Sequence, residues 1–349
     1  MKRTWLALAL ALALLGAATG VQADLDTFWE DLKLRLSPFK KLFTDQSQEL
    51  GDIRKQGIDP EQYTRIDLEL LRDGGPPKDG IPSIDRPQFD TAKTTPFGPD
   101  ELVVAVEING DARAYPYGIM NWHEVVNDTV GGIPVTVSYC PLCDTMIVHG
   151  RGDTTFGVSG KLFESCLVMY DRTDETLYAQ PWAIGIIGPQ VNRTLRRYPV
   201  VKTTLGQWLA AHPDSKILST ETGYARDYFA YPYGSYMTNR TIIFPVRHQN
   251  QLDLHPKAML SYLWQPSESD HPRNDFAGPS TAVTHDRVRS AGELEVPYGG
   301  RKVVARWEPQ LETVVFHDQD GTRLVSSTAF AFVYPAFFGK PLSRRTGAS

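Results

Sequence analysis

Cysteine is scarce in this chain: the 349 residues contain three, together with 8 histidines. Three cysteines cannot build a disulfide-rich scaffold, and a structural zinc site would need a second cysteine pair, which the sequence lacks. The formal net charge is only −5, so the chain also lacks the excess of basic residues that nucleic acid or anionic lipid attracts. We therefore expect no nucleic-acid partner.

Long apolar runs are missing as well, with one exception at the N-terminus. Lys2 and Arg3 precede an unbroken Leu/Ala run over residues 6–15, and small residues follow at 21–23. The run is too short to span a bilayer, and this order is typical of a secretory signal peptide. We expect cleavage after Ala23, no transmembrane span in the mature chain, and a periplasmic or secreted protein. An uncleaved N-terminal anchor is the alternative.

Two of the three cysteines, Cys140 and Cys143, form a Cys-x-x-Cys motif directly after a strand-like segment. This spacing lets both sulfurs approach one another or a single metal ion. In an oxidising compartment the same pair can be a structural disulfide. Cys166 lies in an apolar run, and we expect it to be a small buried residue with no part in the chemistry.

Periodicity and turn signals predict the organisation of the chain. Apolar residues at helical spacing predict an N-terminal helical extension over 24–73, which ends where Gly and Pro become dense. From residue 102 the pattern predicts strands, with a hairpin turn at Asn109-Gly110. Thr204 and Gln207 have the spacing of a capping box and predict a short helix.

These signals predict an α+β protein with a mainly antiparallel, β-rich body and a few short helices. A core at 74–220 is expected to carry the Cys-Pro-Leu-Cys site, and a C-terminal β-rich half at 221–349 can pack with it as one domain.

The second half of the sequence contains an echo of the first. Residues 131–149 align without gaps on 299–317 at a constant offset of 168, with matching Gly, Pro, Thr and His positions. Cys140 then falls on Glu308, and Cys143 on Leu311. If two weakly similar halves arose by duplication, both segments should form equivalent strand–turn–strand units, and the cysteine pair would belong to the first half alone.

Several rare strings occur in one order. They are Gly-Gly-Pro-Pro-Lys-Asp-Gly-Ile-Pro at 74–82, His-Glu-x-x-Asn-Asp at 123–128, Tyr-Cys-Pro-Leu-Cys at 139–143, Ser-Gly-x-Leu at 159–162 and Met-Tyr-Asp-Arg at 169–172. Over about residues 70 to 220 the chain resembles the bacterial and archaeal family catalogued as domain of unknown function 3179. The resemblance supplies no activity, but it implies that His123, Cys140 and Cys143 lie in the part that defines the family. That family usually has Asn or Asp where Cys166 stands.

Two classes of function follow from these residues. The first is a metal-binding or thiol-redox site built on Cys140, Cys143 and His123, because thiolates and imidazole suit copper, zinc or iron. The supporting residues would be Glu124, Met169, Asp171, Arg172 and His149. Of these, Met169 is also typical of core packing, and Asp171 and Arg172 are expected to form an ion pair.

The second class is a non-catalytic module with a structural Cys140–Cys143 disulfide. An aromatic surface would then bind an unknown small molecule, with candidates at Tyr115, Tyr117, Trp122 and Trp182. No catalytic residue is assigned in either class. A thioredoxin-like site is disfavoured because residues 145–148 have the pattern of a strand, whereas that site requires a helix after the motif.

Overall fold

The computed structural model describes residue 54 and the ranges 66–266 and 277–343, and every structural statement below concerns this part of the chain. The expected signal peptide lies outside it, as does most of the helical extension at 24–73. The described end of that extension is a 3-10 turn at Leu68–Leu70 followed by strand β1 (Leu71–Asp73), where we had predicted a helix. The strand forms because residues 71–73 pair with a distant hairpin, which local periodicity cannot report.

The described chain is built mainly from short strands. The elements of the first half are β2 (Phe89–Asp90), β3 (Leu102–Ile108), β4 (Asp111–Pro116), α4 (Tyr117–His123), β5 (Val125–Val130), β6 (Ile133–Cys140), β7 (Thr145–Gly150), β8 (Phe156–Phe163), β9 (Cys166–Asp171), β10 (Leu177–Ala179), β11 (Ile184–Ile187), β12 (Arg197–Tyr198), β13 (Val201–Thr204), α5 (Leu205–Ala211) and β14 (Lys216–Leu218). Those of the second half are β15 (Leu252–Asp253), β16 (Met259–Pro266), β17 (Ala277–Thr284), α6 (His285–Ala291), β18 (Glu293–Tyr298), β19 (Arg301–Glu308), β20 (Thr313–His317), β21 (Ser327–Phe330), α7 (Val333–Phe338) and β22 (Leu342–Ser343).

The predicted fold class is confirmed. Neighbouring strands are antiparallel throughout the described sheets, except that β14 pairs with β4, and β15 with β22, in parallel. The predicted hairpin is present: Asn109 and Gly110 join β3 to β4 with φ angles of 51° and 79°. The capping box of Thr204 and Gln207 starts α5 as expected. Helix α4 was missed, because seven residues are too few to give a clear helical period.

The predicted equivalence of the two segments is confirmed in detail. Cys140 pairs with Thr145 across the β6–β7 turn, and Glu308 pairs with Thr313, each 168 positions further on, across the β19–β20 turn. The turns before them match too, since Gly131 and Gly132 have φ angles of 54° and 80°, and the glycines at 299–300 have 58° and 76°.

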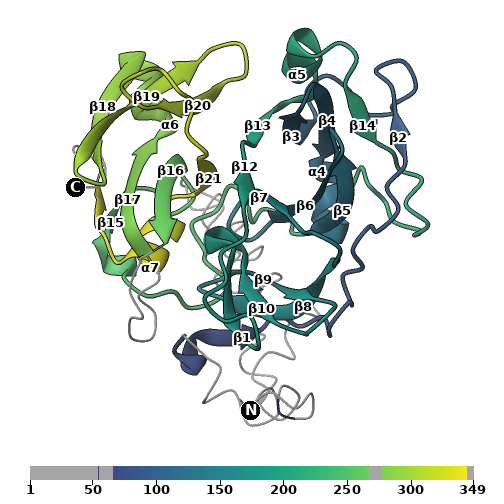
Figure 1. Cartoon of the computed structure of the whole chain (residues 1–349), viewed down its shortest axis with the longest axis horizontal. Helices are drawn as coiled ribbons and strands as arrows, with labels where there is room; N and C mark the ends of the chain where they lie inside the picture. Colours follow the sequence, from purple (N-terminus) through teal and green to yellow (C-terminus); the bar gives the residue numbers. More distant parts are fainter. Residues whose placement is uncertain (1–53, 55–65, 267–276, 344–349) are drawn as a thin grey trace, which may run out of the picture.

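The equivalence extends well beyond the segments seen in the sequence. In both halves a hairpin (β3–β4 or β16–β17) leads into a seven-residue helix and then a three-stranded meander (β5–β7 or β18–β20). In both, a later strand (β13 or β21) then pairs with the first strand of the hairpin. The described part of the chain therefore contains two equivalent β units, which form the two upper lobes of Figure 1.

The copies differ in one large insertion. In the first half, residues 150–196 separate the paired residues His149 and Arg197, whereas 318–322 separate His317 and Arg323 in the second. The insertion carries β8 to β11, which form a sheet with β1 at the bottom of Figure 1. This sheet packs against β5 and β6.

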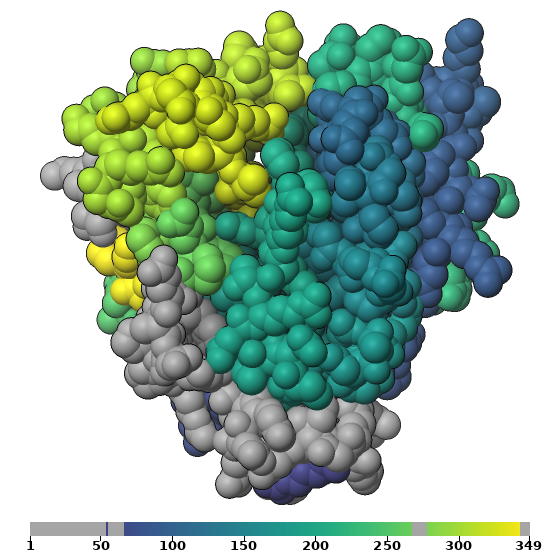
Figure 2. Space-filling view, in the orientation of Figure 1, coloured from purple at the N-terminus to yellow at the C-terminus, as the bar shows by residue number. Residues whose placement is uncertain are grey.

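The two halves also pack against each other. Strand β21 of the second half packs on β7 of the first, and β13 of the first packs on β20 of the second. Figure 2 shows the blue-to-teal half and the green-to-yellow half side by side on the visible face. Each half therefore contributes the equivalent strand to the contact, and the two halves pack together as one body.

Candidate thiol site

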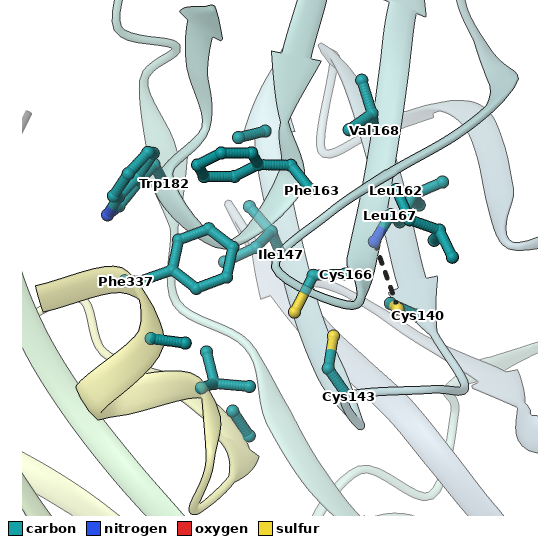
Figure 3. Close-up of a cluster of buried hydrophobic side chains, with 14 of the residues drawn as sticks. Cys140, Cys143, Ile147, Leu162, Phe163, Cys166, Leu167, Val168, Trp182 and Phe337 are labelled. Carbon is teal, nitrogen blue, oxygen red and sulfur yellow. Dashed lines mark hydrogen bonds between the residues drawn. The ribbon is translucent and has the colours of Figure 1, made fainter. Parts of the chain in front are cut away.

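The structure brings all three cysteines together. Cys140 ends β6, Cys143 lies in the turn that follows, and Cys166 starts β9 in the inserted sheet. The backbone N–H of Leu167 donates a hydrogen bond of 3.3 Å to the Cys140 sulfur (Figure 3). The sulfurs of Cys143 and Cys166 point toward one another. All three thiols are free and no more than 1% exposed.

The local environment shifts the pKa values of the three thiols in different directions. Burial raises the pKa of a thiol, but hydrogen bonds from the Cys143 and Cys166 thiols and from the Leu167 N–H hold the pKa of Cys140 well below its ordinary value. The pKa of Cys143 is raised well above its ordinary value by burial and by its hydrogen bond to Cys140. Burial and the same two neighbours raise the pKa of Cys166. Within the cluster, Cys140 is therefore the thiol whose pKa is lowered, and its two neighbours are thiols whose pKa is raised.

A buried carboxyl group accompanies the thiols. Glu124 follows α4 and is 6% exposed, with a φ of 58°, a value that a side chain other than glycine rarely adopts. Burial, followed by the charge of Cys140, raises the pKa of Glu124 well above its ordinary value, and Tyr233 hydrogen-bonds to its carboxyl group. Glu124 thus lies close enough to Cys140 for the charges of the two side chains to interact.

The second half of the chain covers the thiols. The hydroxyl of Tyr236 donates to the carbonyl of Leu142 at 2.8 Å, inside the Cys-Pro-Leu-Cys turn. The backbone N–H of Phe330, at the end of β21, donates to the carbonyl of Cys143 at 2.8 Å. Contacts from two distant segments therefore fix the turn in place.

His123 has other partners in this conformation. Its Nδ1 lies 2.7 Å from the carbonyl oxygen of Pro82, and its Nε2 lies 2.8 Å from the hydroxyl of Tyr228. Because only a protonated Nδ1 can donate to a carbonyl, Nε2 accepts from Tyr228 in the neutral ring. Burial lowers the pKa of His123, which favours that neutral form. Both ring nitrogens are therefore engaged.

The remaining candidates are Met169, His149, Asp171 and Arg172. Met169 is fully buried in the core, within β9. His149 is fully buried, and the centroids of its ring and of the Phe156 ring lie 4.7 Å apart in an edge-to-face arrangement. The predicted ion pair between Asp171 and Arg172 is not formed.

Asp171 and Arg172 are adjacent on the chain but have different partners. Asp171 accepts from the hydroxyl of Thr154 at 2.5 Å and from the backbone N–H of Thr173 at 2.7 Å. Arg172 binds Asp85 at 2.7 Å and Asp79 at 3.3 Å. Neighbours at the end of a strand point to opposite faces, which is why the two side chains do not meet.

The predicted aromatic surface is also wrong. Tyr115, Tyr117 and Trp182 are no more than 6% exposed, and Trp122 is half-buried. The hydroxyls of Tyr115 and Tyr117 are satisfied inside the protein by aspartates at 2.6 and 3.0 Å, which lets both rings enter the core. Tyr115, Tyr117 and Trp182 therefore pack inside the protein and cannot form the predicted surface.

Two findings bear on the metal and membrane expectations. The described residues contain no group of three or more His, Cys, Asp or Glu side chains arranged to hold a metal ion. Within the same part of the chain, no helix has both the length and the apolar character needed to cross a membrane. Copper, zinc or iron at Cys140, Cys143 and His123 stays a prediction.

The thiol turn lies inside the region that comparison with known families identifies. Residues 78–341 match the family described as "Protein of unknown function (DUF3179)". The chain belongs to this family. The match reaches across both copies of the β unit, well past the residues 70 to 220 over which the resemblance was first recognised. No curated protein and no solved structure matches the chain significantly.

Sequence reasoning missed the part that Cys166 and Tyr233 play in this DUF3179 protein. Cys166 was assigned to packing, and its burial fits that role, but the inserted sheet also carries it to the other thiols. Tyr233 reaches Glu124 from the second half of the chain. Contacts of such long sequence separation leave no local signal, so only the fold reveals them.

Proposed function

We propose that this protein is an exported thiol–disulfide oxidoreductase in which Cys140 is the nucleophile and Cys143 the resolving thiol. The observation that carries the proposal is the convergence of three buried thiols, in which the Leu167 N–H donates to the Cys140 sulfur at 3.3 Å and helps to lower the pKa of Cys140. A thiolate is the reactive form of cysteine, and a Cys-x-x-Cys spacing places a second thiol within its reach.

The reaction uses the two cysteines in turn. The Cys140 thiolate attacks one sulfur of a disulfide substrate, forms a mixed disulfide and releases the other substrate sulfur as a thiolate. Cys143 then loses its proton and attacks the Cys140 sulfur, which forms the Cys140–Cys143 bond and releases the second substrate thiolate. Two electrons pass from the cysteine pair to the substrate. Burial and the charge of Cys140 favour the protonated form of Glu124, so this carboxyl group can give its proton to the first departing substrate thiolate and then take up the proton that Cys143 loses.

Access to the site requires movement. The sulfurs are buried under residues that include Tyr236, so a substrate reaches Cys140 when this cover opens. Local opening of this kind costs less free energy than global unfolding.

Metal binding is the second candidate function. It is favoured by the convergence of the three thiols, because thiolates are strong ligands for copper(I), zinc and iron. A metal that also used His123 would have to displace Pro82 or Tyr228 from its ring.

The deciding experiment is a redox titration of the purified protein against dithiothreitol mixtures, followed by acid quenching and peptide mass mapping. We expect a reversible Cys140–Cys143 disulfide with a midpoint within roughly −120 to −270 mV, the range of protein dithiols. The linked peptide should disappear in Cys140→Ser and in Cys143→Ser.

Two results would replace this proposal. Near-stoichiometric metal after anaerobic reduction and reconstitution, lost in both serine variants and weakened in His123→Ala, would establish the metal site. A Cys140–Cys143 bond that resists every reducing mixture, together with a large loss of stability in Cys140→Ser, would establish a structural disulfide.

A further inference from the structure

Cys166 reaches the thiol site through a turn that is unusual for this chain. Phe163 and Cys166 pair across the β8–β9 hairpin, which leaves Glu164 and Ser165 as a two-residue loop. Their φ angles are 51° and 60°. A loop with two positive φ angles favours glycine, because any other side chain is strained there.

Comparable turns in the same chain use glycine. The second loop residue is Gly110, Gly132 or Gly300 in the hairpins β3–β4, β5–β6 and β18–β19, with φ angles between 76° and 80°. The Glu164-Ser165 turn has no glycine, so the surrounding structure must hold it in this conformation.

Contacts from the second half of the chain stabilise the turn in this conformation. Both carboxylate oxygens of Glu164 are bound by Arg247, one by the backbone N–H at 2.8 Å and the other by the guanidinium Nε. Glu164 is fully buried, whereas the Arg247 side chain is 26% exposed, so the carboxylate end of the pairing is shielded from water. The strained turn, the buried ion pair and the hydrogen bond from Leu167 to the Cys140 sulfur together fix where the Cys166 thiol lies.

We infer that Cys166 is a third redox thiol, able to exchange with the Cys140–Cys143 disulfide and form a Cys143–Cys166 bond. Figure 3 shows the sulfurs of Cys143 and Cys166 facing one another from the turn and the hairpin. This inference rests on the proposed thiol–disulfide function and extends it to a site of three thiols.

The exchange step is balanced without a further oxidant. Cys166 loses its proton to solvent and attacks the sulfur of Cys143. The Cys140–Cys143 bond breaks, the Cys143–Cys166 bond forms, and Cys140 leaves as a thiolate that the Leu167 N–H receives. Oxidising equivalents that enter at Cys140 can thus move deeper into the inserted sheet, while Cys140 becomes free to react again.

The test is disulfide mapping of the full-length protein oxidised with excess oxidised glutathione. The wild type should give both linked peptides, Cys140–Cys143 and Cys143–Cys166, with one thiol left per chain. Cys140→Ser should retain the Cys143–Cys166 bond, and Cys166→Ser should retain the Cys140–Cys143 bond. The double variant Cys140→Ser/Cys166→Ser has one thiol and is the matched control for bonds between molecules.

Outcomes separate this inference from the proposed function. A Cys140–Cys143 bond in the wild type and in Cys166→Ser, with no intramolecular bond in Cys140→Ser, would overturn the third thiol and leave the oxidoreductase intact. Absence of any reversible disulfide would overturn both. Circular dichroism must show that Cys140→Ser is folded, and alanine at the same position provides a second variant if it is not.

Discussion

The two copies of the β unit have the same backbone arrangement, but the face that is buried in the first copy is open to solvent in the second. In β6, Thr136, Ser138 and Cys140 face the inserted sheet and are no more than 1% exposed. The equivalent residues of β19 are Val304, Arg306 and Glu308, of which Arg306 is exposed and the other two are half-buried. The covered copy carries the thiols, whereas the open copy carries charges.

The reason for the difference is the insertion. Residues of the insertion form hydrogen bonds with buried polar groups of the first copy. Gln180 donates to the carbonyl of Thr145 at 2.9 Å, and Asn127 donates to the carbonyl of Phe156 at 2.8 Å. Without this cover a meander must present polar side chains to water, as the second copy does. Because the two copies share the β unit itself, the sheet packed onto the first copy accounts for the burial of its thiols.

The largest expected effect concerns a buried ion pair present in the first copy. Arg113 binds both carboxylate oxygens of Asp128 at 2.7 Å, and Tyr115 donates to the same group. The second copy has Thr281 and Val296 at the positions of Arg113 and Asp128. Arg113→Met should lower the free energy of unfolding by about 3 to 5 kcal/mol in urea titrations, because it leaves a buried carboxylate without its partner.

The control copies the second half. In Arg113→Thr/Asp128→Val both charges are gone, and much of the lost stability should return. If the double variant were as unstable as Arg113→Met, the unpaired carboxylate of Asp128 could not be the cause, and the lost contact between Arg113 and Asp111 at 2.7 Å would account for the effect.

The next effect is a difference in pH dependence between the equivalent histidines His149 and His317. Burial lowers the pKa of His149 to about 4, whereas His317 is half-buried. The unfolded chain therefore binds a proton at His149 as the pH falls below about 6.5, but the folded chain does not until about 4, so stability is lost across that window. Between pH 7 and 5 the loss should be about 2 kcal/mol.

Urea titrations at both pH values measure this loss. His149→Gln should flatten the dependence, whereas His317→Gln should alter it less. Equal slopes in the wild type and in His149→Gln would show that other groups cause the acid sensitivity.

A smaller effect should appear at the residue after the helix in each copy. Glu124 has a φ of 58°, and its counterpart Gly292 has 78°. A Cβ added at Gly292 would meet nothing within 4 Å, so Gly292→Ala should cost about 1 kcal/mol through backbone strain alone. For the same reason Glu124→Gly should be more stable than Glu124→Ala by about 1 kcal/mol. Equal stabilities in that last pair would show that Glu124 is not strained.

The smallest effect is expected on the open face. Arg306 pairs with Glu293 at 3.3 Å, and both side chains are more than half exposed. Arg306→Ala should change the free energy of unfolding by less than about 1 kcal/mol, and the change should shrink further in high salt. A larger, salt-independent loss would indicate that this face is not freely solvated.

The sequence predicted the features that depend on neighbours along the chain. The Asn109-Gly110 hairpin, the Thr204 capping box and the repeat at an offset of 168 all appear as expected. Contacts between distant residues could not be predicted. His123 meets Tyr228 across 105 residues, and Cys166 meets Cys140 only because a whole sheet is inserted between β7 and β12. The cysteine motif therefore located the site but did not show which distant residues surround it.

The hydrogen bond from Phe330 to the carbonyl of Cys143 has a consequence for the order of assembly. During synthesis the thiol turn exists long before the strand that fixes it, and contacts of such high contact order form late in folding. Until β21 docks, the three thiols of the nascent chain are open to any oxidant they encounter. Protection of these thiols from a pulse of alkylating reagent would therefore mark the moment at which the last strands close the molecule.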